Sequence, residues 1–415
     1  MNKRKRWHLW LLTGVTSLGL LEIGLRTIYF NLLSSDWSAI GAASRQAWEH
    51  VASALIREQR AAVATDVVNT VPRKDAVRQP VTEPKQGEAA APTAEYRRVL
   101  DIEDDVLDDL TRIGAVIGNA GNPTGAARHD TFLVRPDGEL KYVLRPGAVA
   151  LGYFLRAKNT GNLDPPVLYV SENAVLSDRI ERFLAENAVL TYRYTIDAEG
   201  HRLTVPRVLA DRKVLVVGDS VAFGVGVDDD QTVSSRLQQR LGESVQIVNA
   251  AVGGYNGHQA ARVAKELART GEYDTLVYLA FQNDFMMEAE KSYADSAMAV
   301  LEEFSRVAQD FNGRVIVVLH TYMEYTLHDL LGNWSEKQIL ETDHMRQRIE
   351  EMSRKHRFVY RDFTYAVEDQ SKAEGSIFSR FSLYVDHAHL SPRGNALLAD
   401  SLVSALGELE RDEPF

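Results

Sequence analysis

Four short segments in the second half of the sequence carry side chains that could act together in acyl transfer. They are residues 218–220, 249–254, 282–284 and 386–391. The first ends in Ser220, and the last contains Asp386 and His389. A serine hydroxyl is a poor nucleophile until a base takes its proton, and the usual base is a histidine oriented by a carboxylate. The developing oxyanion needs fixed donors, which a glycine backbone and an asparagine amide can supply.

The elements around these segments alternate between strands and helices. The pattern predicts strands at residues 214–217, 245–248, 275–281, 315–319 and 358–360. It predicts helices at residues 232–241, 257–269, 291–311 and 336–356, and a last helix capped by Ser391 with Pro392 at its first position. Alternating strands and helices indicate βαβ units and a parallel sheet.

This fold class predicts where a site would form. The predicted strands are apolar runs without alternation, so both faces of the sheet are covered by helices. Ligands of such folds bind outside the carboxyl ends of the strands. Three of the four segments follow the first three strands directly, and the fourth precedes the last helix. Each segment alone is an ordinary turn or helix cap, but all four in this order favour a catalytic site.

At this point the sequence resembles the SGNH hydrolases, also called GDSL esterases and lipases, over about residues 213–406. The resemblance implies a flavodoxin-like three-layer α/β/α sandwich with a parallel sheet. It makes Ser220 the nucleophile and its own N–H an oxyanion donor. Asp386 and His389 match the Asp-x-x-His block and complete the triad.

The resemblance also assigns the other oxyanion donors. The glycine donor falls on Gly254, with Gly253 as the neighbouring alternative, and the side-chain donor falls on Asn283. The sequence departs from the family pattern at Phe281, where a glycine is common. This departure bears on how much space is left for the substrate beside the oxyanion. Val221 stands where the family name has leucine. His387 lies beside His389, and the spacing to Asp386 favours His389 as the base.

Other motifs point to no cofactor and no metal. The chain has no cysteine, which excludes disulfides, thiolate catalysis and Cys-ligated zinc. The glycines at 224 and 226 do not complete a dinucleotide loop, since Asp229 stands at the last glycine position. Asp386 and the two neighbouring histidines could bind a metal, but they occupy the triad position. His320, Tyr322 and Trp334 could line a pocket, although a lone histidine is more often a packing residue.

The N-terminus favours export. A basic cluster at residues 3–6 precedes an uncharged, largely apolar run at residues 7–21. Residues 1–30 are interpreted as an uncleaved signal anchor, with a cleaved signal peptide or a buried helix of a soluble protein as alternatives. Residues 21–26 also look like the opening of many bacterial membrane-tethered SGNH proteins. We therefore expect a single-pass protein of the bacterial inner membrane, with its catalytic domain in the periplasm or outside the cell.

Between the anchor and the catalytic domain lie two further segments. Residues 31–93 comprise a helical pattern at 38–64 and a proline-rich linker at 65–93. Residues 94–210 form a small accessory region whose function the sequence does not indicate, and residues 211–415 form the SGNH domain. Within the accessory region we expect a helix at 96–117, a hairpin of strands 131–134 and 140–144, and strands at 167–170 and 190–196. The hairpin turns at Pro136, Asp137 and Gly138.

The resulting hypothesis is a serine esterase that cleaves ester groups, with O-acetyl groups of a carbohydrate as the expected substrate. The alternative is an O-acyltransferase for an extracellular polysaccharide, which could work with a partner membrane acyltransferase. A second alternative is a non-catalytic carbohydrate-binding or scaffold protein. The formal net charge of −11 argues against nucleic acid as a partner, because phosphate binding needs a basic face.

Overall fold

The computed structural model describes residues 102–119, 131–156, 166–270, 272–285, 292–311, 313–328, 334–375 and 377–411. These residues all belong to one compact unit. The predicted anchor at residues 1–30, and the predicted helical segment and linker at residues 31–93, lie outside them. Within the described ranges, no helix is long and apolar enough to cross a membrane.

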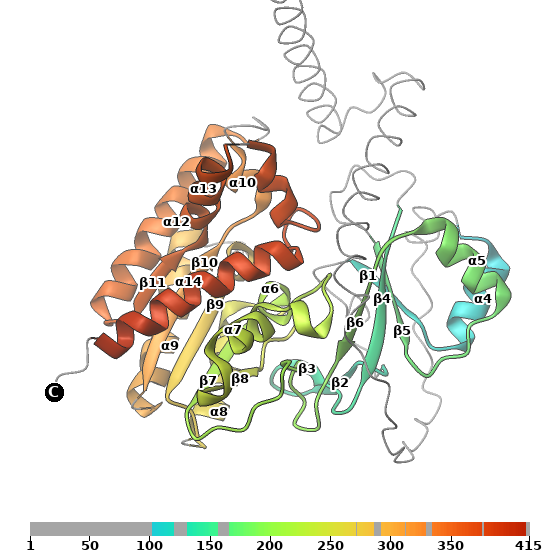
Figure 1. The fold of residues 1–415 in the computed structure, drawn as a ribbon, viewed down its shortest axis with the longest axis horizontal. Coiled ribbons are helices and arrows are strands. Elements are labelled where there is room, and N and C mark those ends of the chain that lie inside the picture. Colours follow the sequence, from blue (N-terminus) through green and yellow to red (C-terminus); the bar gives the residue numbers. More distant parts are fainter. Residues whose placement is uncertain are drawn as a thin grey trace, which may run out of the picture. The chain divides into compact units, whose positions relative to one another are not determined.

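The second half of the chain forms a five-stranded parallel sheet (Figure 1). Its strands are β7 (Lys213–Gly218), β8 (Gln246–Asn249), β9 (Thr275–Phe281), β10 (Arg314–His320) and β11 (Val359–Asp362). The order across the sheet is β11-β10-β9-β7-β8, and every neighbouring pair is parallel. All five strands were predicted. The inner strands β7, β9 and β10 are apolar runs buried on both faces, whereas the edge strands β8 and β11 are only partly buried.

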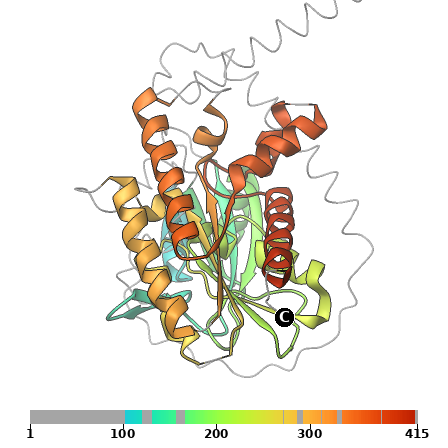
Figure 2. The ribbon, with the colours of Figure 1, turned by 90° about the vertical axis from the view of Figure 1, so that its left-hand side faces the viewer.

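Helices cover both faces of this sheet. Figure 2 shows α9 and α12 on one side of it and α14 on the other. The helices are α7 (Val233–Leu241), α8 (Gly257–Ala268), α9 (Tyr293–Phe311), α12 (Glu336–Lys355), α13 (Phe363–Glu374) and α14 (Pro392–Arg411), with one-turn helices α6 (Ser220–Phe223) and α10 (Met323–Thr326). The α/β fold class is thereby confirmed, whereas α13 was not predicted.

The strand order brings three of the four sequence segments together. β7 lies between β8 and β9, so the carboxyl ends of these three strands are neighbours. The chain leaves β7 at Gly218, whose φ is +153°. A Cβ atom at this position would lie 2.6 Å from the carbonyl oxygen of Leu279 on β9. Only glycine therefore lets β7 turn this closely past its neighbour into Asp219 and Ser220.

The first half of the described chain forms a separate antiparallel sheet of order β1-β5-β4-β6. Its strands are β1 (Val116–Asn119), β4 (Val149–Leu155), β5 (Pro166–Ser171) and β6 (Ala188–Thr195). Helices α4 (Asp104–Arg112) and α5 (Asp178–Asn187) share an apolar cluster with it. A hairpin of β2 (Val134–Asp137) and β3 (Lys141–Leu144) is a further two-stranded sheet.

The accessory region was predicted less well. The helix expected at residues 96–117 is wrong beyond Arg112, because Gly114 takes a φ of +70° and the chain then pairs with β5 as β1. The hairpin is confirmed, although its first strand begins only at Val134 and includes Pro136. The strands expected at 167–170 and 190–196 are confirmed as β5 and β6, whereas β4 and α5 were missed. The division at residues 210 and 211 stays a prediction.

Candidate active site

The structure brings Ser220, His389 and Asp386 together. Ser220 is the first residue of α6 and is separated from the end of β7 by Asp219, and the other two lie in the loop before α14. Nε2 of His389 is 2.8 Å from Oγ of Ser220. Nδ1 of His389 is 2.7 Å from Oδ2 of Asp386. Ser220 is 1% exposed, and the side chains of His389 and Asp386 are 1% and 2% exposed. The three groups form a continuous hydrogen-bonded chain shielded from water.

The Asp-x-x-His spacing has a local structural cause. Oδ1 of Asp386 accepts the backbone N–H groups of Ala388 at 2.8 Å and His389 at 2.7 Å. This Asx turn leaves Oδ2 facing the imidazole of His389, three residues later. The N–H of Val385 donates to the carbonyl of His389 at 2.8 Å and closes the loop. One carboxylate therefore shapes the loop and orients the histidine.

The electrostatics of this pair keep the aspartate ionised. Burial raises the pKa of Asp386, but the charge and hydrogen bond of His389 outweigh it and lower the pKa to about 2. An ionised carboxylate accepts the Nδ1 proton of His389, so the lone pair of Nε2 faces Ser220. This is the tautomer that a general base needs.

The turn after β9 places Asn283 beside the nucleophile segment. Oδ2 of Asp284 accepts the N–H of Phe281 at 3.2 Å and the hydroxyl of Tyr278 at 2.7 Å, which shapes this turn. Burial raises the pKa of Asp219, the residue before Ser220, while hydrogen bonds from the N–H of Val221 and the side chain of Asn283 oppose that rise. The Asn283 amide thus lies within hydrogen-bonding range of the residue next to the nucleophile.

The glycine donor predicted after β8 lies in a tight turn. The N–H of Tyr255 donates to the carbonyl of Val252 at 3.2 Å, which makes Gly253 and Gly254 the central residues. Gly254 takes a φ of +79° and Gly253 is not among the positive-φ residues, so this is a type II turn. The N–H of Val252 donates to the carbonyl of Gly218 at 3.2 Å. The turn is therefore tied to the end of β7, two residues before Ser220.

His320 holds the loop that carries the histidine and aspartate. It ends β10 and is 1% exposed, and its Nε2 donates to the carbonyl of Ala388 at 2.9 Å. Burial lowers the pKa of His320 to about 4, so it is neutral near pH 7. The N–H of Met323 donates to the carbonyl of His387 at 2.8 Å. A lone histidine carries no sequence signal for this role, and the sequence favoured a packing function instead.

Aromatic rings fill the space beside this loop. Phe281, the departure from the family pattern, stacks on His320 at 5.3 Å and meets Tyr322 edge-on at 4.7 Å between ring centroids. The ring of Tyr322 lies parallel to that of His387 at 5.4 Å. Trp334 packs instead against Tyr325 at 5.7 Å. Phe281 is thus part of a ring stack that reaches the residue next to Asp386.

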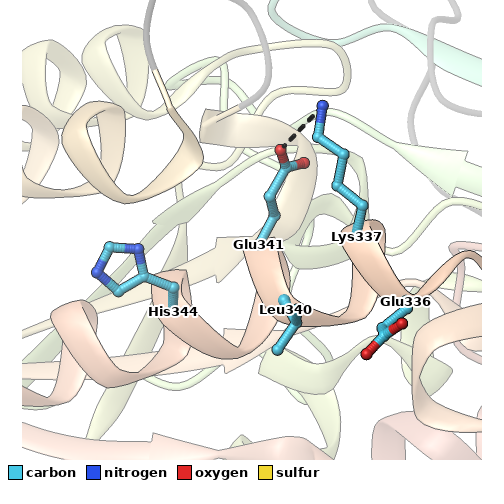
Figure 3. A pocket seen from close by; sticks show the side chains of 5 residues that line it. All are labelled: Glu336, Lys337, Leu340, Glu341 and His344. Atoms are coloured by element: carbon cyan, nitrogen blue, oxygen red, sulfur yellow. Dashed lines mark ion pairs between the residues drawn. The ribbon is translucent and has the colours of Figure 1, made fainter.

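One surface pocket lies elsewhere, along α12 (Figure 3). Its volume is about 470 Å³, and its lining residues are Glu336, Lys337, Leu340, Glu341 and His344. Lys337 and Glu341 form an ion pair at 3.7 Å across it. None of these residues belongs to the predicted site. Among the described residues, no group of three or more His, Cys, Asp or Glu side chains is placed to hold a metal ion.

Comparisons with known proteins identify the family of the part of the chain that carries these residues. Residues 214–402 match the family model of the GDSL-like lipases and acylhydrolases. The chain contains a GDSL-like lipase/acylhydrolase domain. Since members of this family are esterases and lipases, the expectation of a hydrolase enzyme is confirmed. A comparison with curated protein sequences gives no match.

Solved structures similar to the GDSL domain cover about half of the chain. A lipolytic protein of the G-D-S-L family from Veillonella parvula is 16% identical, with 46% of this chain and 97% of that chain covered and a TM-score of 0.36. A carbohydrate acetylesterase family member from Sinorhizobium meliloti is 15% identical, covers 47% and 99%, and has a TM-score of 0.36. The psychrotrophic esterase EstA from a Pseudoalteromonas species is 14% identical, covers 48% and 99%, and also has a TM-score of 0.36.

Proposed function

We propose that this protein is a serine esterase whose nucleophile is Ser220. The observation that carries the proposal is the unbroken hydrogen-bonded chain from Ser220 through His389 to Asp386, with both distances below 3 Å. Nε2 of His389 takes the hydroxyl proton as Oγ of Ser220 attacks the ester carbonyl. The imidazolium that forms is stabilised by the carboxylate of Asp386. It then returns the proton to the leaving alcohol, and an acyl-enzyme remains on Ser220.

Three donors would stabilise the oxyanion of this reaction: the N–H groups of Ser220 and Gly254 and the side-chain amide of Asn283. The strand order supports this assignment, since the three donors follow the neighbouring strands β7, β8 and β9. Fixed donors in a shielded site act more strongly than the same groups in water, because they need no reorganisation as charge develops. Water activated by His389 would then hydrolyse the acyl-enzyme.

We further propose that the acyl group is short, with O-acetyl esters of a carbohydrate as the substrate class. Ser220 and His389 are each 1% exposed, and the rings of Phe281 and Tyr322 pack beside the histidine loop. An acetyl group demands the least room in such surroundings. Hydrolysis rates for p-nitrophenyl acetate, butyrate and octanoate test this proposal. We expect the acetate to have the highest kcat/KM, and a maximum at octanoate would contradict it.

The decisive experiment is covalent labelling of the full chain. We expect a fluorophosphonate to form one adduct on Ser220, found by peptide mass spectrometry, and we expect the adduct to be lost in His389→Ala. Ser220→Ala should lower kcat for p-nitrophenyl acetate by roughly 10⁵-fold. Folded protein with no adduct on Ser220 would overturn the esterase proposal and favour a non-catalytic binding or scaffold protein.

The acceptor of the acyl group distinguishes the esterase from its alternative, an O-acyltransferase for an extracellular polysaccharide. Incubation of the acyl-enzyme with oligosaccharides separates the two, because transfer yields an acetylated sugar and hydrolysis yields free acetate. The location outside the cytoplasm, on an anchor at residues 1–30, is a proposal that rests on the basic and apolar pattern of the sequence alone. Fractionation of the full chain tests it, and recovery in the cytoplasmic fraction would contradict it.

A further inference from the structure

The hairpin of the accessory region reaches the turn that carries the proposed oxyanion donor. The hydroxyl of Tyr142, on β3, donates to the carbonyl oxygen of Gly253 at 2.7 Å. The hydroxyl of Tyr255 donates back to the carbonyl of Tyr142 at 2.5 Å, and the two rings lie 5.4 Å apart. Tyr142 is 4% exposed and Tyr255 is 3% exposed. Two buried tyrosines thus connect the hairpin with the turn.

The carbonyl that Tyr142 binds belongs to a particular peptide group. The peptide between Gly253 and Gly254 consists of the Gly253 carbonyl and the Gly254 N–H. In a trans peptide these two groups point in opposite directions, so a hydrogen bond that fixes the carbonyl also fixes the N–H. Tyr142 therefore determines the direction of the N–H that the proposed mechanism uses, although its side chain touches the opposite side of the peptide.

The turn type makes this restraint necessary. Type I and type II turns differ chiefly by a flip of the central peptide, which here is the Gly253–Gly254 peptide. Glycine tolerates both positive and negative φ, so two adjacent central glycines oppose this flip little by themselves. In the flipped turn the Gly253 carbonyl would point where the Gly254 N–H is needed and would repel an oxyanion.

From these contacts we infer that Tyr142 is a positioning residue, which holds the Gly253–Gly254 peptide in the orientation that stabilises the oxyanion. This inference rests on the proposed esterase function. It assigns the accessory region a part in catalysis, since the hairpin supplies a hydrogen bond from a residue 111 positions away in the sequence. The Gln259 side chain supports the same arrangement, because its Nε2 donates to the carbonyl of Leu140 on the hairpin at 2.7 Å.

The test compares Tyr142→Phe with Tyr255→Phe in the full chain. Both variants lose one buried hydroxyl that links the hairpin to the turn, but only the hydroxyl of Tyr142 binds the central peptide. We expect Tyr142→Phe to lower kcat for p-nitrophenyl acetate by about 10- to 100-fold, somewhat less than the removal of a donor itself, and to leave KM within about twofold. Tyr255→Phe should retain kcat within about threefold.

Two further readouts separate positioning from a loss of folded protein. Titration of active sites with a fluorophosphonate gives the fraction of competent enzyme, which we expect to be equal in wild type and both variants. A boronic acid that forms a tetrahedral adduct with the serine should bind Tyr142→Phe more weakly, in proportion to the loss in kcat. Equal losses of kcat in the two variants would overturn the inference, because they would show that both hydroxyls only attach the hairpin to the turn.

The outcomes also separate this inference from the proposed function. An active wild type with unchanged kcat in Tyr142→Phe would overturn the role of Tyr142 and leave the esterase proposal intact. A wild type that neither hydrolyses the ester nor binds the fluorophosphonate would overturn both, because no oxyanion would then form.

Discussion

The parallel sheet and the accessory region contribute to the site in different ways. The inner strands of the parallel sheet are buried on both faces, Ser220 and the proposed oxyanion donors follow its strands, and His389 and Asp386 lie in the loop before α14. The accessory region carries none of them, yet its side chains bind backbone beside them. Tyr142 binds the Gly253 carbonyl, and the hydroxyl of Tyr192 on β6 lies within hydrogen-bonding range of the Gly226 backbone. Phe154 on β4 also lies against Gly226.

The parallel-sheet region therefore carries the proposed reacting groups, whereas the accessory region restricts the backbone beside them. Strand ends of a parallel sheet place side chains at one edge, but the loops between them remain free to adopt several backbone conformations. A second region that binds those loops restricts them without contributing a reacting atom. The following changes test the comparison, from the largest expected effect to the smallest.

Asp386→Asn tests the chemistry of the parallel-sheet side. The asparagine amide would donate to Nδ1 of His389, so Nε2 would carry the proton and could not accept that of Ser220. We expect kcat to fall by about 10⁴-fold while the fold is retained. Steady-state kinetics with p-nitrophenyl acetate measure it, and Asp369→Asn on the exposed face of α13 is the control. A loss below tenfold would contradict the proposed triad.

Arg202→Met tests the attachment of the accessory region. The Arg202 side chain is fully buried, pairs with Asp229, and donates to the carbonyls of Phe223 at 3.3 Å and Val227 at 3.2 Å. Removal leaves Asp229 without its buried cation, and we expect the free energy of unfolding to fall by about 4 kcal/mol. Urea denaturation measures it. A change below about 1 kcal/mol would show that other contacts dominate this attachment.

His320→Gln tests the link between β10 and the triad loop through pH. The pKa of His320 is lowered from 6.5 to about 4 in the folded chain. Between these values the unfolded chain binds a proton that the folded chain does not, so stability falls as the pH is lowered. Over this window we expect wild type to lose about 3 kcal/mol more than His320→Gln, which cannot titrate. Parallel pH profiles of the two unfolding free energies would contradict this.

Arg262→Gln gives the smallest expected effect and sharpens the contrast with Tyr142. Arg262 on α8 pairs with Glu139 of the hairpin turn, and their side chains are 44% and 63% exposed. Solvent screens such a pair, so we expect less than about 1 kcal/mol in stability and no change in kcat. Thermal unfolding and ester hydrolysis measure both. A marked loss of kcat would show that any weakening of the hairpin, and not the Tyr142 hydroxyl alone, disturbs the oxyanion turn.

Much of the parallel-sheet part follows from the sequence by itself. The strand β9 was predicted over the residues that form it, because a run of seven apolar or small side chains is buried throughout. Pro392 and Ser391 marked the start of α14, since proline suits the first helical position. The grouping of Ser220 with Asp386 and His389 was predicted from the resemblance to the SGNH hydrolases, and the local Asx turn explains the spacing of the last two residues.

Only the tertiary structure decided the role of the accessory region. Its strands are less uniformly apolar than β7, β9 and β10, and Gly114 ended a helix that the periodicity of its neighbours favoured. The hydrogen bond from Tyr142 to Gly253 and the one from His320 to Ala388 join residues 111 and 68 positions apart. Such contacts leave no periodic pattern, because one side chain meets one backbone carbonyl after both have been placed by separate elements. The sequence determined which groups could react, and the packing of two regions decided how their backbone is held.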